Sequence, residues 1–170
     1  MIDHLPDRLD LIATAEAGRV LRGRIPVARL ARVVPALMSD QGELQVEMNL
    51  GKDPDGTCFL AGTIQGEIVL CCQRCMEGMI LPLDLGFRLG LLRDERAMDT
   101  LSDRYEPLLV TAEPANIADI VSDEVLLALP IVPLHRVSDG CNADLKAYKP
   151  PEDEQRENPF AVLAGLKQKQ

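Results

Sequence analysis

Cys72 and Cys75 are the residues whose type and spacing are best suited to chemistry, because they form a CxxC motif. Two thiols at this spacing can direct both sulfurs to one tetrahedral metal ion when the chain turns tightly between them, and the ion then needs two more ligands. The sequence offers one other His/Cys pair, His135 and Cys141. The long gap between the two pairs is not that of a compact zinc ribbon, so the spacing neither supports nor excludes a metal site.

Two other interpretations of the CxxC motif stay open. Redox chemistry of the thioredoxin type favours this motif at a strand-to-helix junction of a βαβ unit, whereas we expect a hairpin here. The cysteines can also be purely structural, as we expect for Cys58 and Cys71, which are small residues of a strand. The chain has five cysteines, an odd number, and its size makes a disulfide framework unnecessary, so we expect reduced thiols or metal ligands.

The common signatures of catalysis are missing from the sequence. The chain has two histidines and contains no GxxxxGK[ST] phosphate loop, no GxSxG nucleophile elbow and no HExxH metalloprotease motif. We therefore expect that the protein is not an enzyme and has no catalytic residues.

Positive charge is concentrated near the N-terminus. Five arginines and no acidic residue lie between Ala17 and Ser39, so this segment has a charge of +5. Because the whole chain has a net charge of −9, the rest of it carries −14. Such a run is commonly a solvated face; the functional interpretation is a strip that contacts phosphate, which arginine neutralises with release of counterions. The candidate RNA-binding residues are Arg22, Arg24, Arg29 and Arg32.

A sheet is expected to position these residues. Apolar residues alternate with polar ones over residues 21–25, 44–50, 57–72 and 79–91, which is the pattern of half-buried strands, and residues 52–56 form a turn rich in Pro and Gly. The CxxC motif then lies at the turn between the third and fourth strands. Residues 93–106 are predicted to be a loop, after which residues 108–110 return briefly to the sheet.

Three helices complete the prediction. A short N-terminal helix is expected over residues 30–37, where apolar residues recur at helical spacing until Pro35 ends or kinks it. A longer helix is expected over residues 116–129, capped by Asn116 and ended by Pro130. The last begins at Asn158-Pro159 and has an apolar side that either docks a partner or closes the fold; its residues are Phe160, Leu163 and Leu166.

The predicted fold class is therefore α+β, built on an antiparallel sheet, and whether the sheet closes into a barrel stays open. We expect one α+β domain over residues 1–137, followed at residues 138–170 by a partly disordered acidic linker and the C-terminal helix. Apolar residues make up 46% and charged residues 26%, which is typical of a globular protein. With neither a membrane span nor a signal sequence apparent, we expect a cytoplasmic location. Aromatic residues make up only 3%, so an aromatic stacking platform for single-stranded nucleic acid is not expected.

Three stretches in this order resemble the bacterial YceD family, also called large ribosomal RNA subunit accumulation protein. They are residues 69–77 (VLCCQRCME), 119–135 (DIVSDEVLLALPIVPLH) and 158–167 (NPFAVLAGLK). The N-terminal residues 21–27 (LRGRIPV) are similar to the family as well. The resemblance implies a non-enzymatic role in ribosome biogenesis, namely in the synthesis, processing or stability of 23S rRNA for the large subunit.

The resemblance also bears on the metal site. Some relatives carry a cysteine-rich segment after the Leu-Pro-x-x-Pro motif, which would complete a site with the CxxC pair. In this chain that segment has shrunk to His135 and Cys141, so the implied set is Cys72, Cys75, His135 and Cys141, with zinc as the hypothetical ion.

Two hypotheses describe how the protein acts. In the first, the arginine strip contacts 23S rRNA or its precursor directly. In the alternative, the acidic body binds a basic large-subunit ribosomal protein or another assembly factor, and the effect on rRNA is indirect. Neither hypothesis involves a membrane.

Overall fold

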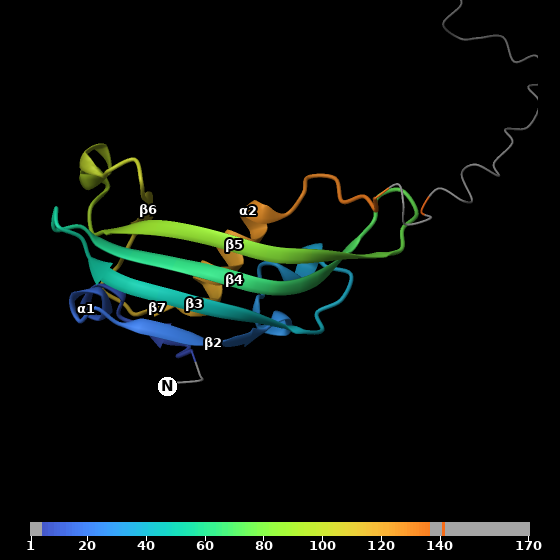
Figure 1. Cartoon of the computed structure of the whole chain (residues 1–170), viewed down its shortest axis with the longest axis horizontal. Coiled ribbons are helices and arrows are strands. Elements are labelled where there is room, and N and C mark those ends of the chain that lie inside the picture. The colour runs from blue at the N-terminus through green and yellow to red at the C-terminus, as the bar shows by residue number, and fades with distance from the viewer. Residues whose placement is uncertain (1–4, 137–140, 142–170) are drawn as a thin grey trace, which may run out of the picture. The chain divides into compact units, whose positions relative to one another are not determined.

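The computed structural model describes residues 5–136 and residue 141. Contacts group the chain into two compact units, Met1–His135 and Arg136–Gln170, and all the helices and strands described below belong to the first (Figure 1). The N-terminal part consists of β1 (Arg8–Leu9), α1 (Leu11–Glu16), β2 (Val20–Pro26), η1 (Val27–Arg29) and η2 (Val34–Ala36). The rest consists of β3 (Glu43–Lys52), β4 (Cys58–Cys71), β5 (Gly78–Leu92), η3 (Glu95–Thr100), β6 (Glu106–Leu109), β7 (Ala115–Asn116) and α2 (Ile117–Ala128); η denotes a 3₁₀ helix.

A five-stranded sheet dominates the first unit, and its strand order is β2-β3-β4-β5-β6 (Figure 1). The pairs from β2 to β5 are antiparallel and follow one another along the chain, as the alternating pattern predicts. The expectation of a wholly antiparallel sheet is wrong at one edge, because β6 runs parallel to β5. A parallel pair needs a long crossover, and residues 93–105, which include η3, supply it.

The sheet is open within the described residues, so the barrel alternative is wrong. β2 and β6 lie at opposite edges and do not pair with each other. The short strands β1 and β7 form a separate two-stranded pair instead.

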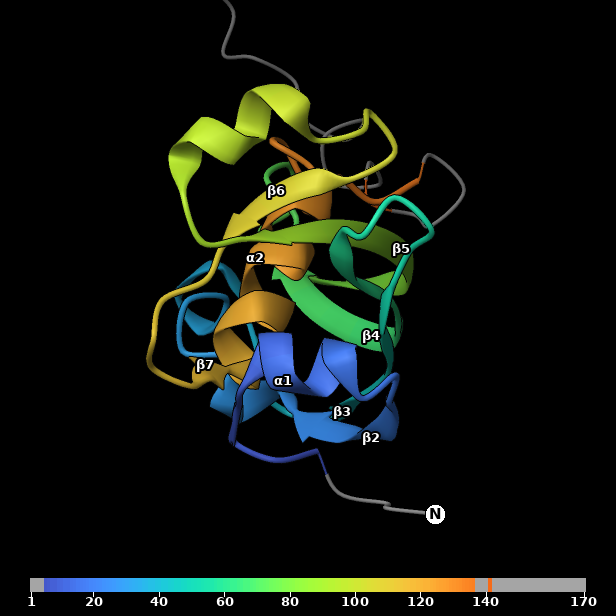
Figure 2. The same ribbon diagram turned by 90° about the vertical axis from the view of Figure 1, so that its left-hand side faces the viewer.

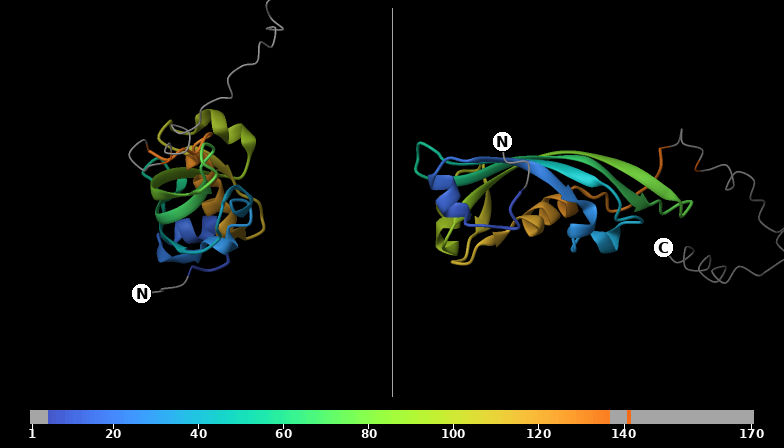
Figure 3. Two further views of the ribbon diagram at one scale, coloured as in Figure 1. Left: turned by 90° about the vertical axis from the view of Figure 1, so that its right-hand side faces the viewer. Right: turned by 90° about the horizontal axis from the view of Figure 1, so that it is seen from below.

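One face of the sheet forms the core. On β3, every second side chain is completely buried, and β4 and β5 continue this face toward the two α-helices (Figure 3). The helices add their own apolar stripes, since α1 contacts β3 and β4 while α2 contacts β5. The largest side chains that are fully buried in this core are Leu11, Leu30, Leu44, Met48, Leu50, Leu60, Ile64, Ile68, Leu70 and Ile117. Each contributes roughly 1.5–3 kcal/mol by leaving water.

The opposite face of the sheet, called here the outer face, is polar. The strand registers place Arg22, Glu47, Thr63 and Gly86 in one row across it, and Asn49, Ala61 and Arg88 in the next. Alternation along each strand thus separates a packed apolar face from an outer face available for binding.

The helix α2 lies where the sequence predicts the longer helix. Asn116 caps it, because its Oδ1 accepts a hydrogen bond of 3.1 Å from the amide of Ala118. The helix ends at Ala128, and Leu129 is extended as expected for a residue that precedes proline. No helix in the described part of the chain is long and apolar enough to cross a bilayer.

The N-terminal helix lies elsewhere than predicted. Within residues 30–37 the helical part is only the 3₁₀ turn η2, which follows a non-helical turn over residues 31–33, although Leu30 and Val33 are fully buried as their spacing suggests. Pro35 removes a backbone donor within this segment, so a regular α-helix is not favoured there. The α-helix is instead α1, which Asp10 caps by accepting from Ala13 N at 2.9 Å. The view from the end of the sheet shows α1 close to β2 and β3 (Figure 2).

The predicted linker and C-terminal helix, with Phe160, Leu163 and Leu166, lie outside the described residues. Their roles stay predictions.

Candidate functional site

The turn between β4 and β5 holds the two cysteines of the CxxC motif. It is tight: Met76 N donates to the Cys72 carbonyl at 2.8 Å, and Cys72 N donates to the Glu77 carbonyl at 2.9 Å. Met76 has a φ of 61°, in the left-handed region that lets the chain reverse within a few residues. Cys72 is fully buried and Cys75 is half-buried.

The segment that follows α2 brings His135 to this turn. Gln73 N donates to the Pro133 carbonyl at 2.9 Å, and His135 N donates to Cys72 Sγ at 3.5 Å. The His135 ring places Nδ1 3.4 Å from Cys75 Sγ and Nε2 3.1 Å from the Gly78 carbonyl oxygen. A carbonyl oxygen only accepts, so Nε2 carries the ring proton and Nδ1 turns its lone pair toward Cys75.

These residues fit a zinc ion. The ligand atoms of Cys72, Cys75 and His135 lie within 4.8 Å of one another, and with Cys141 they make up a Cys3His set that could hold a metal. Thiolates with one imidazole are typical donors for structural zinc. The Gly78 carbonyl on Nε2 and the His135 amide on Cys72 Sγ are outer contacts of the kind that orient metal ligands. Cys141 belongs to the second unit, where it is half-buried.

The four arginines of the predicted RNA-binding strip all form ion pairs. Arg22 pairs with Glu47 at 2.8 Å and Arg24 with Glu43 at 3.7 Å, while Arg29 pairs with Asp7 and Arg32 with Asp123. The hydrogen bond between Arg22 and Glu47 raises the pKa of Arg22 and lowers that of Glu47. Such exposed pairs contribute little to stability. Because each of the four guanidinium groups is paired, a phosphate group must compete with a carboxylate in order to bind it.

The structure brings three of these four arginines together. Arg22, Arg24 and Arg29 line a groove of about 710 Å³ beside the edge strand β2. Arg32 lies in the turn after η1 and pairs with a residue of α2 instead.

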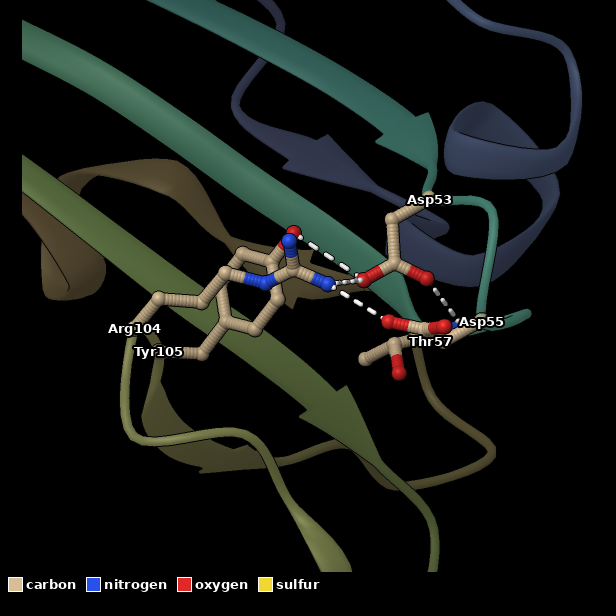
Figure 4. Close-up of polar contacts among 5 residues, drawn as sticks. All are labelled: Asp53, Asp55, Thr57, Arg104 and Tyr105. Carbon is tan, nitrogen blue, oxygen red and sulfur yellow. Dashed lines mark hydrogen bonds and ion pairs between the residues drawn. The ribbon is translucent and has the colours of Figure 1, made fainter.

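A second polar cluster joins the β3–β4 turn to the end of the crossover before β6 (Figure 4). Asp53, whose side chain is only 5% exposed, accepts from Arg104 Nη2 at 2.7 Å, from the Tyr105 hydroxyl at 3.2 Å and from Thr57 N at 2.8 Å. Arg104 also binds Asp55 at 2.9 Å. Burial raises the pKa of Asp53, but these hydrogen bonds and the charge of Arg104 outweigh it, so the net pKa is lowered.

The ring of Tyr105 contacts two further side chains. Its ring stacks on Phe59 with centroids 5.9 Å apart and an angle of 16°, and the Arg104 guanidinium carbon lies 5.0 Å from its centroid. Burial raises the pKa of Tyr105 above its usual value, while the charge of Arg104 opposes the rise.

This cluster borders a groove of about 750 Å³ on the outer face of the sheet. The sequence did not point to it, because residues 93–106 have the composition of a simple polar loop and their partners lie about fifty positions earlier. One feature of the sequence could have indicated the groove. Arg88 lies at a polar position within residues 79–91, the stretch with the clearest alternation of apolar and polar residues.

The comparisons with known proteins agree with one another. The family model described as "Large ribosomal RNA subunit accumulation protein YceD" matches residues 60–167. Curated proteins that match include "Large ribosomal RNA subunit accumulation protein YceD" of Haemophilus influenzae, which is 31% identical over 170 residues, covering 97% of each chain. No solved structure matches the chain.

Proposed function

The chain belongs to the YceD family, and on this basis we propose that it promotes the accumulation of the RNA of the large ribosomal subunit. The observation that carries the proposal is the relative of that name, which is similar over 97% of both chains. The corresponding RNA is 23S rRNA in bacteria, so the protein is a ribosome biogenesis factor under this proposal.

A genetic experiment tests this function. Deletion of the gene in its own organism should lower the ratio of mature 23S to 16S rRNA, and a plasmid copy should restore the ratio. An unchanged ratio, under conditions in which the protein is normally made, would contradict the proposal.

A non-enzymatic role is part of the proposal. Its support lies in the sequence, which lacks the common phosphate-binding, nucleophile and metalloprotease motifs. Purified protein incubated with precursor 23S rRNA and Mg²⁺ should leave the length of that RNA unchanged. Shortening at discrete positions would argue for an enzyme.

The first candidate mode of action is direct contact with 23S rRNA or its precursor through Arg22, Arg24, Arg29 and Arg32. Its support is the groove that three of these side chains line beside β2. Crosslinking in growing cells should then give discrete peaks on the precursor, and neutralising all four arginines to glutamine should remove them.

The second candidate mode is an acidic adaptor for a basic ribosomal protein or assembly factor. The ion pairing of all four strip arginines favours it, because the strip then presents little unbalanced positive charge. A direct protein partner should survive nuclease treatment before co-purification, whereas a partner bridged by RNA should be lost.

We also propose that Cys72, Cys75, His135 and Cys141 hold one zinc ion. The support is the donor set, together with the orientation of His135 by Gly78. A bound zinc ion supplies a structural cross-link, so the residues of the β4–β5 turn would be tied to the segment that follows α2.

A further inference from the structure

The groove on the outer face combines an open floor with polar walls. Ala61 and Thr63 of β4 and Gly86 of β5 line its middle, and Asn49 lies on the β3 side while Arg88 lies on the β5 side. A Cβ atom built on Gly86 would meet no heavy atom within 4 Å, so the space above this residue is open. A flat group can therefore approach the sheet closely at this point.

Arg88 differs from the other arginines around it. Within the described residues it forms no ion pair, whereas Arg22 is held by Glu47 and Arg104 by two aspartates. Burial raises the pKa of the Tyr105 hydroxyl, and the charge of Arg88 is close enough to oppose part of that rise. An anion can thus bind Arg88 without displacing a carboxylate, unlike at the arginines of the β2 groove.

Three carboxylates also line the groove, but they do not prevent an anion from binding Arg88. Glu47 is neutralised by Arg22. Asp103 and Glu106 are exposed, so their side chains can turn into solvent, where their charges are screened.

Arg104 lines the same groove as Arg88 and is held in place by several contacts. Arg104 is bound by Asp53 and Asp55, and its guanidinium carbon lies over the Tyr105 ring, 5.0 Å from the centroid. Its side chain is still 43% exposed. A planar base can stack on an arginine guanidinium, and a fixed guanidinium loses little conformational freedom when it does so.

We propose that this groove holds one nucleotide of a single-stranded RNA, with a phosphate on Arg88 and the base against Arg104 over Gly86. Asn49 and Thr63 line the same groove and supply polar atoms for hydrogen bonds to the nucleotide. A duplex does not suit the groove, because its bases are already stacked on one another. The inference rests on the proposed function, since it names the form of RNA that a factor for large-subunit rRNA would contact.

Fluorescence anisotropy with a labelled twelve-nucleotide RNA of mixed sequence, single-stranded or annealed to its complement, tests the proposal on the full-length protein. Arg88→Gln should weaken single-strand binding about tenfold and reduce the log–log salt slope by about 0.7, the share of one phosphate contact. Gly86→Leu should weaken it by a similar factor, because the new side chain fills the open space. Arg96→Gln removes the same charge from an exposed site on η3 and should change binding less than twofold. Thermal melting of each variant checks that it folds.

Three outcomes would overturn the proposal. They are equal binding by folded Arg88→Gln or Gly86→Leu, equal affinity for the duplex, and binding of a lysine-rich peptide with no binding of RNA. The last outcome would assign the groove to a basic protein through Asp103 and Glu106. None of them alters the 23S to 16S ratio in cells, so failure of this inference is separable from failure of the proposed function.

Discussion

His135 is oriented so that only one of its ring nitrogens is available to a metal ion. Nε2 lies 3.1 Å from the Gly78 carbonyl and carries the proton, while Nδ1 faces Cys75 at 3.4 Å. The sequence can identify His135 as a candidate ligand. It cannot predict which ring nitrogen carries the proton, because the acceptor is the backbone carbonyl of Gly78, and a residue of any type has such a carbonyl. This orientation makes the zinc proposal specific at the level of single atoms.

The zinc proposal predicts that Cys75→Ser and His135→Asn lose bound metal together with stability. Purified, untagged parent protein should contain close to one equivalent of zinc by elemental analysis, and each variant should fall below about a tenth. Loss of the cross-link should lower the Tm by roughly 5 °C or more, since a metal that binds only the folded state stabilises it.

Cys58→Ser is the matched control, because Cys58 is a half-buried cysteine at the far end of β4. It should retain its zinc. Metal-free parent protein, with a Tm that a chelator does not change, would refute the site.

The lowered pKa of Asp53 leads us to expect that the stability of the protein depends on pH. The pKa of Asp53 in the folded protein is lowered from 3.8, so the stabilisation from its ionised form is present above that value and is lost as the pH falls through the lower folded pKa. Asp53→Asn should therefore be less stable than the parent at pH 7, and its Tm should fall less than that of the parent between about pH 4 and pH 2.

Asp99→Asn is the control for Asp53, since Asp99 is an exposed carboxylate of η3. Its Tm should follow the parent over the same range of pH. If Asp53→Asn and the parent lose stability in parallel on acidification, the cluster around Arg104 does not hold Asp53 ionised.

At the scale of elements, strands were the most predictable part of the fold. The alternation over residues 79–91 identifies β5 because one face is buried and the other is polar, and residues 44–50 identify β3 in the same way. The direction of β6 could not be predicted, because four residues carry no signal for parallel or antiparallel pairing. The prediction for residues 30–37 was wrong for a different reason. Buried Leu30 and Val33 have a helical spacing, but they lie between the 3₁₀ turns η1 and η2, and this arrangement buries both without an α-helix.

The helix α2 carries a carboxylate that opposes folding at neutral pH. Burial raises the pKa of Glu124, and the charges of Glu106 and Asp123 raise it further. For a raised carboxyl pKa, stability is fully present below the unfolded value of about 4.5 and is lost as the pH rises through the folded pKa. Glu124→Gln should thus raise the Tm at pH 7 by roughly 1–2 °C and should have no such effect at pH 4.

Asp119→Asn provides the comparison on the same helix. Asp119 lies exposed in the first turn, where a negative charge favours the helix dipole, so its removal should lower the Tm slightly at pH 7. An equal gain from both variants would mean that relief of general negative charge, and not the burial of Glu124, explains the effect.

At the scale of the whole molecule, the acidic net charge of −9 and the arginine strip are connected through ion pairs. The sequence shows the strip as a segment of +5, but its partners Glu43, Glu47, Asp7 and Asp123 lie far away along the chain and become visible only in the folded structure. Carboxylates therefore screen the strip, and any RNA that binds it must displace them or act beside them.

This screening predicts that removing the paired carboxylates strengthens RNA binding. Glu43→Gln together with Glu47→Gln leaves Arg24 and Arg22 without their acidic partners, so affinity for a single-stranded RNA should rise several-fold and the log–log salt slope should steepen by about 0.7 per arginine released. Glu67→Gln with Asp99→Asn changes the net charge by the same amount at exposed sites outside these pairs, and should raise affinity much less. If both double variants gain equally, RNA responds only to the total charge of the molecule. In that case the arginine strip has no special part in binding, and the acidic adaptor becomes the better account of how the protein acts.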